Sequence, residues 1–179
     1  MDELVDILDE KGNYTGKTTM KSEAHKLGLF HPTVHVWCYS KNGMVLLQQR
    51  GGNKSIDPLK WDVSVAGHIG AGETPEISAY REVQEEIGVT INASKLQKIE
   101  VFKIEKRHSK SIWDREFTHT YLYEMDQGVT LIKQESEVEA LEWISLEVFE
   151  TRIIEQETLF VTHSTNRYRK VIENIRLRL

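Results

Sequence analysis

Three glutamates crowd into one short stretch of the chain. Glu82, Glu85 and Glu86 fall within "GHIGAGETPEISAYREVQEEIGV", residues 67–89. On a helix, residues three and four apart share a face, so the three carboxylates would point to one patch. Like charges at this spacing repel and destabilise an isolated helix. A solvated charged face is the ordinary explanation, but hard divalent cations such as Mg²⁺ prefer oxygen ligands and would relieve the repulsion.

The residues around the glutamates predict the helix that would carry them. Pro75 suits the first helical position, Thr74 suits the cap before it, and Gly88 suits the stop. Between these signals, apolar side chains recur at spacings of three and four and predict a core-facing stripe: Tyr80, Val83 and Ile87.

One cation and several glycines accompany the glutamates. Arg81 can reach Glu85 one turn along, and a bend in the preceding loop would bring Glu73 back to Arg81 as an arginine–carboxylate pair. A glycine at the start of that loop, Gly67, would let a backbone carbonyl approach a metal ion closely. Together these features favour a metal site over a solvated face.

The same stretch resembles the Nudix box. The pattern consists of Gly67, five residues, Glu73, seven residues, and then "REVQEEIGV" from Arg81. The resemblance implies the Nudix fold, an α/β/α sandwich with a mixed β-sheet, over a single domain of residues 1–179. It also implies Mg²⁺- or Mn²⁺-dependent cleavage of a nucleoside diphosphate linked to another group. By position, the metal ligands would be Gly67, Glu82, Glu85 and Glu86, and the structural pair would be Glu73 and Arg81.

The flanking sequence is similar to a narrower branch, the isopentenyl-diphosphate isomerases and their hydrolase relatives. The similarity is carried by "LFHPTVHVWCYSKNGMVLLQQRGGNKSIDPLKWDVSVAGH". In the isomerase a catalytic cysteine precedes the glycine that opens the box, and here that position is Ala66. Cys38, in an apolar segment, is expected to be a small buried hydrophobe. The resemblance therefore favours the hydrolase type.

The same branch suggests further site residues. His31, His68 and Glu116 lie near its metal-ligand positions, and His68 is the strongest of these as a substrate or metal contact. Arg50 and Lys54 lie near its diphosphate-binding cations, although Arg and Lys are mostly exposed in proteins. His35 and His119 carry less weight.

The general base is open on sequence grounds. Glu82 and Glu85 are candidates within the box, and the outside candidates are Glu116, Glu135 and Glu137. Aromatic residues could stack a base or pack in the core, and packing is the commoner role: Trp37, Trp61, Trp113 and Tyr121.

The rest of the chain predicts strands mixed with a few helices. Two strands should flank Gly12–Asn13, and a short helix should end at Gly28. "PTVHVWCYS" and "MVLLQQR" should form a hairpin around residues 41–43, with a polar loop at 51–59. Strands are further expected in "KWDVSVAGH", "KLQKIEVFKIEK", "FTHTYLYEMD" and "VEALEWISL". Helices are expected after Ser145 and over "STNRYRKVIENIRLRL".

Composition narrows the partners. With 179 residues and a formal charge of -5, the chain is sized for one domain and is not suited to nucleic-acid polymers. A single cysteine excludes an internal disulfide, and no secretory signal or membrane-spanning run is seen, which predicts a cytoplasmic protein. The expected partner is a small diphosphate compound, with no membrane, and the chain could be a monomer or a homodimer. The alternatives left open are the isomerase and a non-catalytic nucleotide or diphosphate sensor.

Overall fold

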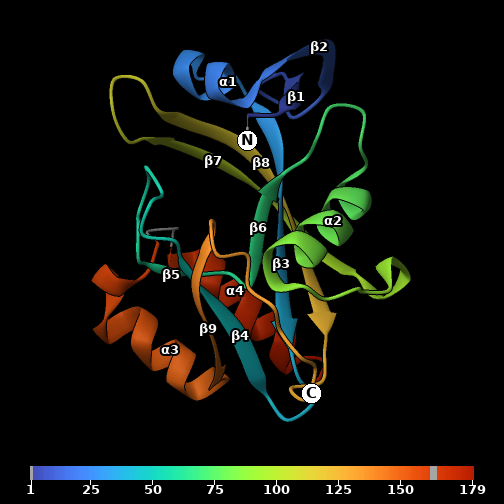
Figure 1. Ribbon diagram of the computed structural model, residues 1–179, viewed down its shortest axis with the longest axis vertical. Coiled ribbons are helices and arrows are strands. Elements are labelled where there is room, and N and C mark those ends of the chain that lie inside the picture. The colour runs from blue at the N-terminus through green and yellow to red at the C-terminus, as the bar shows by residue number, and fades with distance from the viewer. Residues whose placement is uncertain (1, 162–164) are drawn as a thin grey trace.

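A mixed β-sheet between helices forms the body of the protein (Figure 1). The computed structural model describes residues 2–161 and 165–179. The strands are β1 (Leu4–Leu8), β2 (Tyr14–Met20), β3 (His31–Tyr39), β4 (Met44–Arg50), β5 (Trp61–Asp62), β6 (Val65–His68), β7 (Gln97–Arg107), β8 (Trp113–Glu124) and β9 (Val138–Ser145). The helices are α1 (Lys21–Leu27), α2 (Pro75–Ile87), α3 (Leu146–Glu155) and α4 (Thr165–Arg176), with short 3₁₀ turns at Ala93–Lys95 and Glu157–Leu159.

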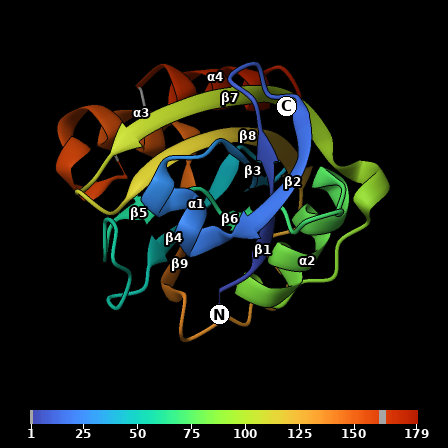
Figure 2. The same cartoon turned by 90° about the horizontal axis from the view of Figure 1, so that it is seen from above.

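The main sheet runs in the order β5-β4-β3-β8-β7, with β6 paired to β3 and β9 paired to β4. The β3–β8 pair is parallel and the other pairs are antiparallel, so the sheet is mixed. Helix α2 lies on one side, while α3 and α4 lie on the other (Figure 2). The expected α/β/α sandwich is confirmed. The β1–β2 hairpin and α1 sit at one end and join the sheet through bridges at Val5–Gly70 and Leu8–Phe30.

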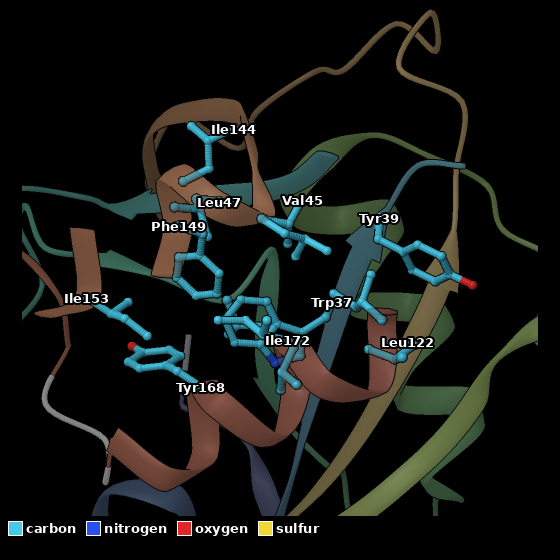
Figure 3. Close-up of a cluster of buried hydrophobic side chains, with 14 of the residues drawn as sticks. Trp37, Tyr39, Val45, Leu47, Leu122, Ile144, Phe149, Ile153, Tyr168 and Ile172 are labelled. Atoms are coloured by element: carbon cyan, nitrogen blue, oxygen red, sulfur yellow. The ribbon is translucent and has the colours of Figure 1, made fainter. Parts of the chain in front are cut away.

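Two apolar cores lie on opposite faces of β3, because successive side chains of a strand alternate. Trp37 packs against α3 and α4 through Phe149, Tyr168 and Ile172 (Figure 3). Val36 and Cys38 pack on the other face with Val83 and Ile87 of α2. The odd-numbered residues of β3 therefore face α4, and the even-numbered residues face α2.

Helix boundaries agree with the sequence signals. The hydroxyl of Thr74 accepts from the backbone N–H of Ile77, and Gly88 takes the left-handed conformation at φ 71°. Ser145 caps α3 in the same way, and Gly28 ends α1. The first residue of the predicted C-terminal helix, residue 164, lies outside the described residues.

The predicted hairpin of β3 and β4 forms only next to its turn. Over the described residues, the two strands pair only at Tyr39 and Val45. Beyond that point β4 pairs with β5 and β9, whereas β3 pairs with β6 and β8. Each strand thus satisfies its backbone hydrogen bonds with other partners, and the two separate toward the site described below. No helix among the described residues is long and apolar enough to span a bilayer.

Candidate active site

A cleft of about 980 Å³ collects most of the residues that the sequence singled out for the site. Ten of them line it: Arg50, Lys54, Gly67, His68, Glu73, Arg81, Glu82, Glu85, Glu86 and Glu116. Twelve lining residues are Asp or Glu and seven are Lys or Arg. This excess of acid would repel an anionic substrate unless cations entered with it. The roles of the ten residues remain predictions, but the convergence of these residues on one cleft is a feature of the structure.

The three glutamates of α2 sit at different depths. Glu82 and Glu86 are buried, with 8% and 5% exposure, whereas the Glu85 side chain is 50% exposed. Val83 and Ile87 are fully buried beside them and fix the helix against the sheet. The glutamates are therefore held on a rigid scaffold.

Gly67 allows the closest approach between β6 and α2. A Cβ atom on this residue would lie 2.1 Å from Cδ of Glu82, so no other residue fits without displacing that carboxylate. The backbone of Gly67 and the carboxylate of Glu82 are thus in direct contact. That proximity fits the expectation that a Gly67 carbonyl and a Glu82 carboxylate share one ion.

Arg81 ties the glutamates to the loop before the helix. Its guanidinium contacts Glu82 at 2.7 Å, Glu73 at 3.1 Å and Glu85 at 3.6 Å, and donates to the carbonyl of His68. Glu73 also accepts from the Ser78 hydroxyl at 2.6 Å. The predicted Glu73–Arg81 pair is present, although it uses one nitrogen because the other faces Glu82.

Burial makes two of these carboxylates hard to ionise. Burial raises the pKa of Glu82 to about 7, against the opposing effect of Arg81. Burial likewise raises the pKa of Glu86 to about 7, although the Gln48 side chain and the Ala66 N–H donate to it. A buried carboxylate with such a pKa is stabilised in its charged form by a bound cation.

A second cluster, three of whose four members line the same cleft, was only partly foreseen. The ligand atoms of His25, His31, His68 and Glu116 all lie within 4.8 Å of one another. Within the described part of the chain, this is the one group of three or more His, Cys, Asp or Glu residues with such mutual spacing. Three imidazoles and one carboxylate form a donor set that suits a divalent transition metal.

The histidines of this cluster are oriented as metal ligands usually are. Nδ1 of His31 lies 2.8 Å from the carbonyl of Leu29, so that nitrogen carries the proton and Nε2 presents its lone pair. Among the described residues, this buried Nε2 has no hydrogen-bond partner. Burial lowers the pKa of His31 to about 4, which keeps the ring neutral. Nε2 of His25 lies 3.2 Å from Nε2 of His68.

Asp114 supports the cluster from outside. One of its oxygens lies 3.1 Å from Nδ1 of His25, and the other lies 2.7 Å from Nε2 of His108. Burial opposes the charge of His25, but the contact with the Asp114 carboxylate raises its pKa. His25 and Asp114 were missed in the sequence. One sequence feature could have indicated them. The turn predicted at Gly28 lies between His25 and His31, which are six positions apart.

The two predicted phosphate-binding cations are engaged in the loop at 51–60. Arg50 donates from Nε and Nη2 to the carbonyl of Ile56, and its Nη1 lies 3.9 Å from Asp62. Lys54 forms an ion pair with Glu137. Both cations line the cleft, so a diphosphate would compete with Glu137 for Lys54.

The remaining candidate site residues differ in whether they line the cleft. Glu137 lines the cleft, whereas Glu135 does not. His35 lines it too, but His119 does not. The four aromatic residues lie outside the lining that the described residues form: Trp37, Trp61, Trp113 and Tyr121. We therefore do not assign base stacking to those four rings.

The position of the isomerase cysteine is filled by a methyl group. Ala66 lines the cleft and pairs with His35 across β6 and β3. Cys38 is fully buried on the α2 face of β3, and burial raises the pKa of its thiol to about 12. Cys38 is thus the buried hydrophobe that the sequence predicts and does not reach the cleft.

Comparison with known proteins agrees with this architecture. The NUDIX domain model matches residues 29–162. Nudix hydrolase 3 of Arabidopsis thaliana is 33% identical over 183 residues, covering 99% of this chain and 24% of that protein. An isopentenyl-diphosphate Delta-isomerase of Serratia proteamaculans is 30% identical over 122 residues, covering 68% of this chain and 66% of the isomerase.

The fold is also found in a solved structure. The DR0079 protein of Deinococcus radiodurans is similar with a TM-score of 0.72 at 22% identity, covering 94% of this chain and 98% of that one. This chain spans between 24% and 59% of the length of the curated Nudix hydrolases among these matches.

Proposed function

The chain belongs to the NUDIX domain family, and from that premise we propose that it is a divalent-metal-dependent pyrophosphohydrolase acting on a small organic diphosphate. The observation that carries the proposal is the convergence of the three box glutamates, Gly67 and two basic side chains on one acidic cleft. Nucleoside diphosphate derivatives and related organic diphosphates are the substrate class.

The donor atoms in the cleft fit Mg²⁺ or Mn²⁺. Glu82, Glu85, Glu86 and the Gly67 carbonyl supply only oxygen, which both ions prefer. The cluster of His25, His31, His68 and Glu116 could hold a further transition-metal ion. Such ions, when bound, supply Lewis-acid stabilisation of the diphosphate and lower the pKa of an attacking water.

The chain itself supplies binding, orientation and a proton acceptor. Arg50 and Lys54 line the cleft and would bind the diphosphate oxygens, arginine through its planar fork and lysine as a point charge. Arg81 forms ion pairs with Glu82 and Glu85 and orients them. Burial of the cleft floor strengthens each of these interactions because less water screens them.

The candidates for the general base differ in whether they line the cleft. Glu82, Glu85, Glu116 and Glu137 line the cleft and Glu135 does not, so we favour the first four as candidates. Burial raises the pKa of Glu116 to about 7, close to the value at which a base is most efficient near neutral pH. Thr33 donates to Glu116 at 3.2 Å and orients it.

The isomerase alternative lacks its proton carrier. Ala66 has no acidic hydrogen, and Cys38 lies on the opposite face of β3. The sensor alternative predicts a damaged box, but every position of this one is filled. Hydrolysis is therefore the activity that the residues support best.

A release screen tests the proposal. The purified protein is incubated with a panel of organic diphosphates and either Mg²⁺ or Mn²⁺, and phosphate or nucleotide products are measured. We expect turnover of at least one compound that disappears with a chelator and returns with metal. Binding without turnover in both metals would favour the sensor, and conversion of isopentenyl diphosphate to its allylic isomer would favour the isomerase.

A further inference from the structure

Arg167 places a buried positive charge in the wall of the cleft, away from the box. It lies on α4, is only 2% exposed, and lines the cleft. Arginine is almost never so buried without a specific reason. None of the sequence motifs accounts for it, and it comes from the opposite layer of the fold to the glutamates.

The fold holds this guanidinium in one orientation. Nη2 of Arg167 lies 2.5 Å from Nδ1 of His35, and the guanidinium lies 5.3 Å from the centre of the Phe102 ring. A guanidinium has five N–H donors in a planar fork, and the contact with His35 engages one of them.

The position of His35 places Arg167 next to the predicted diphosphate site. His35 pairs with Ala66, and Ala66 precedes Gly67, whose backbone meets Glu82. Adjacent strands lie about 5 Å apart. Gly67, Ala66 and Arg167 line the same cleft, so a group attached to a diphosphate held at Gly67 can face Arg167 there.

The charge around Arg167 indicates what kind of group fits. Burial lowers the pKa of its guanidinium, and the carboxylates of Asp62 and Glu116 oppose that effect. Asp62 is itself buried and lines the cleft. Asp62 and Glu116 line the same cleft as Arg167, and their negative charge disfavours a further anion there. A hydroxyl group both accepts and donates hydrogen bonds, so it matches Arg167 and Asp62 together.

We infer that Arg167 is a specificity-determining residue that receives the organic group of the substrate and selects a neutral, hydroxyl-rich group such as a sugar over a hydrocarbon chain. The inference rests on the proposed function, because it requires the diphosphate to bind at the box. It also explains how Ala66 could be useful: a methyl group leaves room for the ligand.

A matched pair of ligands tests this inference without turnover. The probes are methylene-bridged analogues of ribose 5-diphosphate and n-pentyl diphosphate, which differ in their hydroxyl groups and ring but not in carbon number. Binding is measured by calorimetry in Mg²⁺. We expect the wild type to bind the ribose compound about ten- to a hundredfold more tightly, as for hydrogen bonds to a charged group.

Three variants sharpen the test. Arg167→Met should abolish the preference by weakening ribose binding and sparing pentyl binding. Arg167→Lys keeps the charge but not the planar fork, and its preference for the ribose compound should be several-fold smaller than that of the wild type. This variant replaces Arg167→Met in the test if Arg167→Met does not fold. Arg169→Met, on the exposed side of the same helix, should retain it.

The outcomes separate the two proposals. Equal binding of the two analogues by the wild type, or an unchanged preference in folded Arg167→Met or Arg167→Lys, would overturn the role of Arg167 alone. Failure of both analogues to bind in Mg²⁺ would overturn the diphosphate site and this inference with it.

Discussion

The cleft has two walls that could each bind metal, and they are built differently. The glutamate wall comes from one helix and the loop before it, residues 67–89. The histidine wall takes His25 from α1, His31 from β3, His68 from β6 and Glu116 from β8. The first offers oxygen ligands and the second mostly nitrogen. The difference suggests separate tasks, with the glutamates serving the diphosphate and the histidines serving a transition metal.

The largest predicted effect falls on the glutamate wall. Glu85→Gln should lower divalent-dependent turnover by about 10²–10⁴-fold or more, because it removes a metal ligand or base. Stability should change by no more than about 0.5 kcal/mol, since the side chain is half exposed. Turnover kinetics and urea unfolding measure the two quantities.

The matched control is Glu139→Gln, an exposed glutamate on β9 outside the cleft lining. It should leave turnover unchanged. Near-normal turnover in Glu85→Gln would remove this residue from the proposed site.

A smaller effect is expected on the histidine wall. Asp114→Asn should weaken transition-metal binding by about 10–100-fold, because Asp114 orients His25. Titration with Mn²⁺ should show one weakened class of sites while the class assigned to the glutamates is retained. Equal weakening of both classes would mean that the walls do not bind metal independently.

Acidification of the metal-free protein should change the stability contributions of the two walls in opposite directions. The pKa of Glu86 is raised to about 7, so its ionisation costs stability that is recovered as the pH falls through 7 toward 4.5. The pKa of His31 is lowered to about 4, so its contribution is present above pH 6.5 and is lost as the pH falls.

Glu86→Gln isolates the glutamate side of this comparison. In the presence of a chelator, the variant should gain unfolding free energy over the wild type at pH 8, and that gain should shrink by about 2 kcal/mol at pH 5.5. Urea unfolding at both pH values measures the difference. A gain that grows on acidification would contradict the assigned direction.

The smallest effect concerns Ala66. Ala66→Cys should not produce efficient isomerisation of isopentenyl diphosphate, because one thiol restores only one of the groups that such proton transfer requires. Product analysis detects the dimethylallyl isomer. Its appearance at a substantial rate would show that this cleft is an isomerase site lacking only its cysteine.

The two walls also show what the sequence could reveal. Helix α2 was predictable because Thr74, Pro75 and Gly88 act locally, and the glutamate spacing lies within one element. His25 was missed because its proximity to His68 depends on how α1 packs against the sheet, and the two residues are 43 positions apart. Likewise the parallel β3–β8 pair joins residues more than 80 positions apart, which periodicity does not encode.

Arg167 illustrates the same limit. It lies in an amphipathic helix whose predicted apolar stripe is confirmed by buried Tyr168, Val171, Ile172 and Ile175. Its polarity alone would have placed it on the exposed side. Only the meeting of α4 with His35 and Phe102 reveals that it faces the cleft.

The most direct test of the account is a calorimetric titration of Mn²⁺ into the protein with methylenediphosphonate present, repeated with Glu82→Gln. We expect Mn²⁺ uptake by the wild type that strengthens with the diphosphonate, and loss of that strengthening in the variant. Absence of Mn²⁺ uptake by the wild type, or equal behaviour of both proteins, would contradict the claim that the box glutamates hold the ions that bind the diphosphate.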